Sequence, residues 1–240
     1  MIYYSQLLSP AYPMTHARIG WHSYDYTASG AIADATNIAN TTTYDTSAFT
    51  GLVTLTFSSS KAVDYVGILS KTETTVSITC GTKSYSVTLY KGANMFLFDE
   101  QTVSSLTISC TATIAHVKAG LTLDMQRSVY GGLSPIKLSR KTSVRPNLSE
   151  TGQFLGSTVK RVGYGSSIDF QNLTADWYRS DFEPFVNSVP MASPFFIAWR
   201  PSSFPDEVVY AWATNDIQPT NSGVRDLMAV TLNFEAFYIA

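Results

Sequence analysis

Short runs of β-branched and aromatic residues follow one another through the first half of the chain. Alternation is clear in residues 84–90, where Tyr85, Val87 and Leu89 fall on one face. Turn-forming residues separate the runs, for example at 58–60 and 91–94. Short strands at this spacing are typical of a sandwich or barrel. The pattern predicts strands at 51–57, 64–69, 74–80, 84–90, 94–98, 105–110 and 116–123.

Residues 21–48, which precede the first of these runs, lack this pattern. They are rich in Ala, Thr, Asn and Asp and carry little hydrophobic periodicity. Long connections of this kind are often functional. We therefore expect a long loop region here.

The second half combines strands with one amphipathic helix. Thr174 is a favourable N-cap before the segment 175–189, and Pro184 must kink or restart that helix. Its apolar positions share one face: Trp177, Phe182, Phe185 and Val189. Strand patterns occupy 157–164, 194–200, 207–214 and 226–239. The last of these has a hydrophobic row on one side, formed by Met228, Val230, Leu232, Phe234 and Ala236.

These patterns predict an all-β protein, mainly β with one helix, in two domains. A turn-rich segment at 126–134, where the charge character also changes, marks the boundary. The expected architecture is a β-sandwich or jelly roll over 1–125. It is followed over 126–240 by a β-sheet or small barrel with one packed helix.

Composition indicates an assembly subunit rather than a freely diffusing enzyme. Apolar residues make up 45% of the chain and charged residues only 14%, against the roughly 25% usual for soluble domains. A net charge of −2 argues against specific nucleic-acid recognition. No apolar run approaches the roughly 20 residues of a membrane span, and the start of the chain has no signal-peptide pattern. Cys80 and Cys110 are interpreted as two buried thiols or as a disulfide.

Basic residues concentrate in one stretch. Residues 127–161 hold seven of the sixteen basic residues and a single acid, Glu150. This bias predicts an extended arm over about 134–161. The alternative is a solvated basic hairpin without a partner.

Motifs for catalysis are missing from the sequence. His16, His22 and His116 do not stand at metal-ligand spacing, and no nucleophile-elbow, phosphate-loop or dinucleotide motif occurs. We therefore expect a non-enzyme with no catalytic residues, no metal and no cofactor.

One aromatic cluster is a candidate binding surface. Trp21, Tyr24, Asp25 and Tyr26 combine rings with a carboxylate, a combination that suits stacking and hydrogen bonding to a sugar. The competing interpretation makes Trp21 and Tyr24 core anchors of the first domain.

Two regions resemble known families. Residues 53–57 (VTLTF) and 63–69 (VDYVGIL), after their polar loop, resemble galactose-binding-like jelly-roll domains of phage structural proteins. Residues 130–240 resemble a C-terminal region of tail-associated proteins of tailed bacteriophages and the tail-tube fold. Their matching segments are SETGQFLGSTVKRVGY, NLTADWYRSDFEPFVNSVPMASPFFIAWRP and EVVYAWATNDIQPTNSGVRDLMAVTLNFEAF. Distal-tail proteins place these two domain types in the opposite order.

The resemblance implies a tail-tip or baseplate protein of the virion tail, made in the bacterial host cytoplasm. It implies a ring, commonly a hexamer, between the tail tube and the hub or baseplate proteins. The basic arm would then contact a neighbouring subunit through Lys137, Arg140, Lys141 and Arg145.

Two other functions compete with this one. The alternative is a carbohydrate-binding or receptor-recognition module of a phage tail, contacting tail fibres or host surface glycan. A hydrolase is the third hypothesis, and it requires an acid pair or a triad in a cleft.

Overall fold

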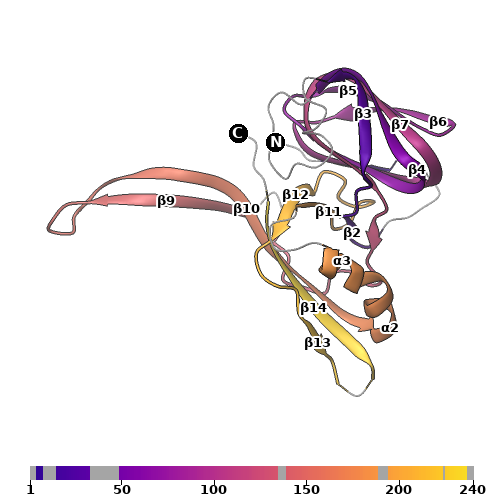
Figure 1. Cartoon of the computed structure of the whole chain (residues 1–240). Helices are drawn as coiled ribbons and strands as arrows, with labels where there is room; N and C mark the ends of the chain where they lie inside the picture. Colours follow the sequence, from indigo (N-terminus) through magenta and orange to yellow (C-terminus); the bar gives the residue numbers. More distant parts are fainter. Residues whose placement is uncertain are drawn as a thin grey trace.

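A computed structural model describes residues 4–7, 15–32, 49–134, 139–188, 194–223 and 225–236. The protein is mainly β with one helix, which confirms the predicted fold class. Figure 1 shows an upper body built from the first half of the chain, a lower body built mostly from the second half, and a long hairpin leaving their junction.

The first sheet is a sandwich made largely by two long bent strands. Its strand order is β3-β4-β7-β5-β6, with β1 added in parallel to β7. Residues 65–70 of β4 lie between residues 92–97 and 114–120 of β7, whereas residues 49–56 pair with 105–114. The strands are β1 (Tyr4–Leu7), β3 (Tyr26–Ile32), β4 (Phe49–Ser70), β5 (Thr74–Cys80), β6 (Lys83–Leu89) and β7 (Gly92–Gly120).

One layer of this sandwich is buried on both faces. Val66 and Ile68 point into the sandwich core, whereas Tyr65 and Leu69 join the core shared with the second sheet. On β7, Phe96 likewise belongs to the sandwich core and Met95 to the shared core. Because both faces are covered, these strands read as continuous apolar runs rather than as alternating ones.

The second sheet is open and draws on both halves of the chain. Its order is β8-β2-β11-β12-β14-β10-β9, with β13 added to β14. The predicted barrel closure is absent among the described residues, because one end is a two-residue strand and the other leaves the body as a hairpin. The strands are β2 (Arg18–Gly20), β8 (Leu123–Asp124), β9 (Arg140–Leu148), β10 (Phe154–Thr174), β11 (Phe195–Ala198), β12 (Val208–Ala213), β13 (Pro219–Asn221) and β14 (Leu227–Ala236).

The sheets therefore do not separate at residue 125. β2 and β8 precede the predicted boundary, yet they pair into the sheet of the second half. The division into domains at 1–125 and 126–240 remains a prediction.

The predicted helix forms, and its middle is a π-helical turn. It runs through α2 (Ala175–Trp177), the π turn η2 (Tyr178–Phe182) and α3 (Glu183–Ser188). Only Glu183 separates the π turn from Pro184, which has no backbone N–H to donate. Phe182 and Phe185 are fully buried against the second sheet; Val189 lies outside the described residues.

Thr174 caps this helix as expected and also anchors a neighbouring segment. Its Oγ1 accepts the backbone N–H of Trp177 at 3.4 Å and the Gln126 side-chain amide at 2.9 Å. Replacing Thr174 by alanine is expected to lower the free energy of unfolding by about 1–2 kcal/mol, since both bonds are lost. Thr174→Ser keeps the hydroxyl and serves as the control in urea titrations. Equal losses in the two variants would contradict the capping role.

One local prediction needs correction, and the structure decides between the two interpretations of the cysteines in favour of buried thiols. The polar region 21–48 is not wholly a loop, because Tyr26–Ile32 forms β3 and pairs with β4; residues 33–48 lie outside the described part. Cys80 and Cys110 are both buried free thiols. In the ladder Cys80 faces Leu106, four residues or roughly 13 Å along the strand from Cys110, which is too far for a disulfide.

Candidate functional site: a projecting hairpin and a cavity

The predicted basic arm is a two-stranded antiparallel hairpin. β9 pairs with residues 154–164 of β10, from Arg140 opposite Tyr164 to Leu148 opposite Phe154. Residues 164–174 of β10 pair with β14 in the body. Figure 1 shows the hairpin extending far from both bodies. Isolated two-stranded hairpins are at best marginally stable in water, so this arm has little support within its own chain.

The pairing register gives the arm two unlike faces. Residues directly opposite each other share a face, and successive residues alternate. Val144 faces Val159 and Leu148 faces Phe154, and these four make one apolar face together with Pro146. All are well exposed, Phe154 at 67% and Val159 at 56%. The other face carries Arg145, Asn147 and Thr158. Leu155, which is 68% exposed, lies unpaired in the register shift between Phe154 and Gly156.

The predicted contact residues of the arm differ in their exposure and in their ion pairs. Arg140 and Arg145 are exposed on β9. Lys141 is engaged within its own chain, since its Nζ lies 2.6 Å from Glu235 Oε1 on β14. Lys141 therefore ties the base of the arm to the body. Lys137 lies outside the described residues.

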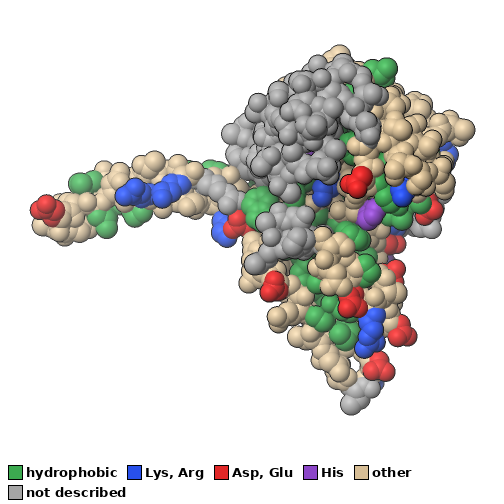
Figure 2. All heavy atoms as spheres, in the orientation of Figure 1, with side chains coloured by type: hydrophobic (Ala, Val, Ile, Leu, Met, Phe, Trp, Pro, Cys, Tyr) green, Lys and Arg blue, Asp and Glu red, His purple; other side chains and the backbone are tan. Residues whose placement is uncertain are grey.

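Charge is divided unevenly between the arm and the rest of the chain. Residues 139–161 carry five basic residues and one acid, and the remaining chain carries eleven basic residues and seventeen acids. Figure 2 shows Lys and Arg side chains along the arm and Asp and Glu side chains over the lower body. A positive arm and a negative body are electrostatically complementary.

The four predicted glycan-contact residues do not form one surface. Tyr26 is buried in the sandwich core, where its hydroxyl donates to the carbonyl of Val117 at 3.1 Å. Asp25 is exposed but lies outside the cavity that Trp21 and Tyr24 line. Trp21 and Tyr24, the two rings that the competing interpretation makes core anchors, are half-buried, and each packs against one of the two hydrophobic cores. A role of Trp21 and Tyr24 in sugar binding stays a prediction.

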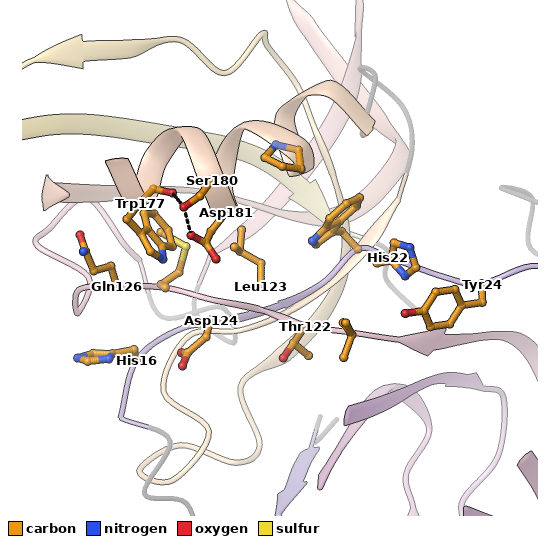
Figure 3. Close-up of a pocket in the computed structure, with 14 residues that line it drawn as sticks. His16, His22, Tyr24, Thr122, Leu123, Asp124, Gln126, Trp177, Ser180 and Asp181 are labelled. Carbon is orange, nitrogen blue, oxygen red and sulfur yellow. Dashed lines mark hydrogen bonds between the residues drawn. The ribbon is translucent and has the colours of Figure 1, made fainter. Parts of the chain in front are cut away.

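That cavity has a volume of about 510 Å³ and lies where three distant segments meet. The segment 16–24 and residues 121–126 form one side, and the helix forms the other (Figure 3). The helix contributes Trp177, Ser180, Asp181 and Pro184. This i, i+3, i+4, i+7 spacing is one helix face, and Phe182 and Phe185 occupy the opposite, buried face.

The polar side chains of the cavity differ in how far they are paired with other side chains of the protein. Asp124 forms an ion pair with Arg18 at 2.8 Å, although burial raises the pKa of its carboxyl. The nitrogen and the oxygen of the Gln126 side-chain amide each form a hydrogen bond with Thr174. Ser180 donates to Asp181, and among the described residues no basic side chain pairs with that carboxylate. Burial, followed by Lys61 and Lys118, lowers the pKa of His22.

Sequence reasoning missed most of this cavity. The sequence pattern places Trp177 on the apolar helix face with Phe182 and Phe185, whereas its half-buried ring also lines the cavity. Ser180, Asp181 and Asp124 are not among the predicted site residues. The polar face of the helix was a usable signal for the first two. The other two lining segments, 16–24 and 121–126, are distant from the helix in the sequence, and only the fold brings them beside it.

Comparisons with known proteins do not identify the chain. No family model matches it, and no curated protein matches it in sequence. Within the described ranges, no group of three His, Cys, Asp or Glu side chains is arranged to hold a metal ion. Over the same ranges, no helix combines the length and apolar character needed to cross a membrane.

Proposed function

We propose that the protein is a non-catalytic structural subunit of a bacteriophage tail tip or baseplate, and that the β9–β10 arm joins it to a neighbouring copy. The single observation that carries the proposal is the projecting hairpin with one apolar face. The resemblance of residues 130–240 to tail-associated proteins supplies the biological setting.

The exposed apolar face is the physical reason for assembly. Val144, Leu148, Phe154 and Val159 are each 46–67% exposed on a ribbon that no other described element covers. Burying such side chains against a partner is favourable by roughly 25 cal/mol per Å² of apolar surface. The hairpin also has two free edges, and pairing them removes an aggregation hazard.

A second copy of the chain is the partner that fits the charges. The basic arm would meet the acidic remainder of its neighbour in a head-to-tail contact, in which arm and body surfaces are different patches. A head-to-tail contact of this kind forms a closed ring when the rotation between neighbouring copies returns to the first copy after one full turn. In the proposed setting the ring, commonly a hexamer, joins the tail tube to the tip complex.

The alternative function is a carbohydrate-binding or receptor-recognition module of a phage tail. One observation favours it: two predicted glycan-contact rings, Trp21 and Tyr24, line a cavity with exposed carboxylates. The two functions are compatible, because the cavity and the arm use different residues.

The assembly proposal is tested by the solution mass of the purified full chain, measured by light scattering at several concentrations. We expect a multiple of the 26.3 kDa chain mass. The double variant Val144→Ser, Val159→Ser is expected to shift the protein to monomer. Leu52→Ser is the matched control, because Leu52 is also 56% exposed but lies on the sandwich.

Charge gives an independent readout of the same contact. Arg145→Glu combined with Lys160→Glu is expected to weaken association, and raised salt should weaken it in the unmodified protein as well. A unimodal monomer at all concentrations, or an oligomer that the arm variants leave intact, would contradict the proposed role of the arm.

A further inference from the structure

We infer that the cavity between the helix, β8 and residues 16–24 binds one ring of an uncharged sugar, with Trp177 as the stacking surface and Asp181 as the principal hydrogen-bond acceptor. This inference is separate from the assembly role, because none of the arm residues contributes to the cavity.

The cavity has the size and lining of a ligand site. Its volume of about 510 Å³ falls within the roughly 300–1,000 Å³ of small-molecule pockets. Trp21, Tyr24 and Trp177 supply aromatic surface, and Ser180, Asp181 and Asp124 supply polar atoms. In Figure 3 the Trp177 ring and the Ser180 and Asp181 side chains lie together on the helix side, facing His16 and Asp124.

The helix is shaped to present this surface. Its π turn, Tyr178–Phe182, contains Ser180 and Asp181, and π-helical segments frequently occur at functional sites. The same turn places Tyr178 and Phe182 in the core, which holds the helix while its other face stays open. The Ser180 hydroxyl lies within hydrogen-bond distance of two acceptors, the Asp181 carboxylate and, at 3.4 Å, the Trp177 carbonyl.

The donors and acceptors match hydroxyl groups. A carboxylate only accepts hydrogen bonds and an indole N–H only donates, whereas a sugar hydroxyl does both. Neither indole N–H of Trp21 and Trp177 has an acceptor among the described residues. A pyranose ring also has an apolar C–H face, which packs on an indole ring.

The unpaired carboxylate of the cavity disfavours acidic ligands beside Asp181. The Asp124 carboxylate is offset by Arg18, whereas Asp181 has no basic partner in the described part of the chain. A ligand carboxylate or phosphate placed there would meet a like charge without compensation. An uncharged sugar therefore fits better than a sialylated or phosphorylated one.

The test is a tryptophan-fluorescence titration of the full chain with chitotriose, maltotriose and lactose, and with sialyllactose as the anionic probe. We expect saturable binding of at least one uncharged oligosaccharide and none of sialyllactose. Asp181→Asn is expected to weaken binding about tenfold, because a charge-assisted hydrogen bond becomes a neutral one. Trp177→Phe is expected to weaken it as well while keeping an aromatic ring in the core contact.

Two controls make the result decisive. Trp212→Phe alters a tryptophan outside the cavity and should leave the affinity unchanged. Near-ultraviolet circular dichroism checks that each variant is folded. The inference is overturned if none of the three uncharged probes binds, if sialyllactose binds best, or if Asp181→Asn and Trp177→Phe bind as tightly as the unmodified protein.

Discussion

Replacing Gly67 by alanine is expected to lower the free energy of unfolding by about 1–3 kcal/mol, the usual range for overpacking a core. A Cβ built at this position would lie 2.5 Å from the Phe196 ring, which is itself fully buried on β11. The glycine therefore permits the sandwich and the second sheet to approach each other. Urea denaturation of the full chain measures the loss.

Gly131→Ala is the matched control for this prediction. A Cβ at Gly131 would have no atom within 4 Å, and its backbone is not in the left-handed region. This variant should stay within about 0.5 kcal/mol of the unmodified protein. Equal stability of Gly67→Ala and Gly131→Ala would show that the two sheets do not pack as closely as described.

Acidification is expected to destabilise the protein through His116. This side chain is 4% exposed, lies against the Tyr210 ring between the two sheets, and has no hydrogen-bond partner for either ring nitrogen among the described residues. Burial, followed by the charge of Lys118, lowers the pKa of His116 to about 3. Its ordinary pKa of 6.5 applies in the unfolded chain.

The sign of the effect follows from proton binding. Between about pH 6.5 and pH 3 the unfolded chain binds a proton at His116 that the folded chain does not bind. This site alone therefore lowers the free energy of unfolding by about 1.4 kcal/mol for each pH unit of acidification in that window. Asp64 acts in the opposite direction below about pH 6, because burial raises the pKa of its folded carboxyl to about 6.

The difference between the unmodified protein and His116→Leu isolates the histidine, since Asp64 is common to both. We expect the stability advantage of His116→Leu to grow as the pH falls from 7 to 4, measured by urea titration at each pH. His16→Leu, at a cavity position outside the core, is the control. Parallel pH profiles for the unmodified protein and His116→Leu would contradict the burial of an uncharged imidazole.

Local features of the fold were predictable because they depend on residues close in the chain. The strand 74–80 coincides with β5, the cap at Thr174 and the restart near Pro184 are present, and Val230, Leu232, Phe234 and Ala236 are buried as the alternation required. Each of these follows from side-chain periodicity or from the hydrogen-bonding capacity of one residue.

Separate predicted strands nevertheless merged into long bent ones. The runs at 51–57 and 64–69 became parts of β4, and those at 94–98, 105–110 and 116–123 fall largely within β7. The turn residues between them form register shifts in a continuous ladder rather than chain reversals. Ladder continuity depends on the partner strand, so a single-strand pattern does not reveal it.

The β class, the helix and its cap, and the concentration of basic residues in the arm can all be read from the chain alone, since composition and periodicity are properties of short segments. Tertiary structure alone decided that β2 and β8 join the second sheet, that the arm has one apolar face, and that Trp177 and Asp181 share a cavity with His16 and Asp124. These features depend on strand register and on contacts between residues more than a hundred positions apart, and such contacts arise only when the whole chain buries its apolar surface together.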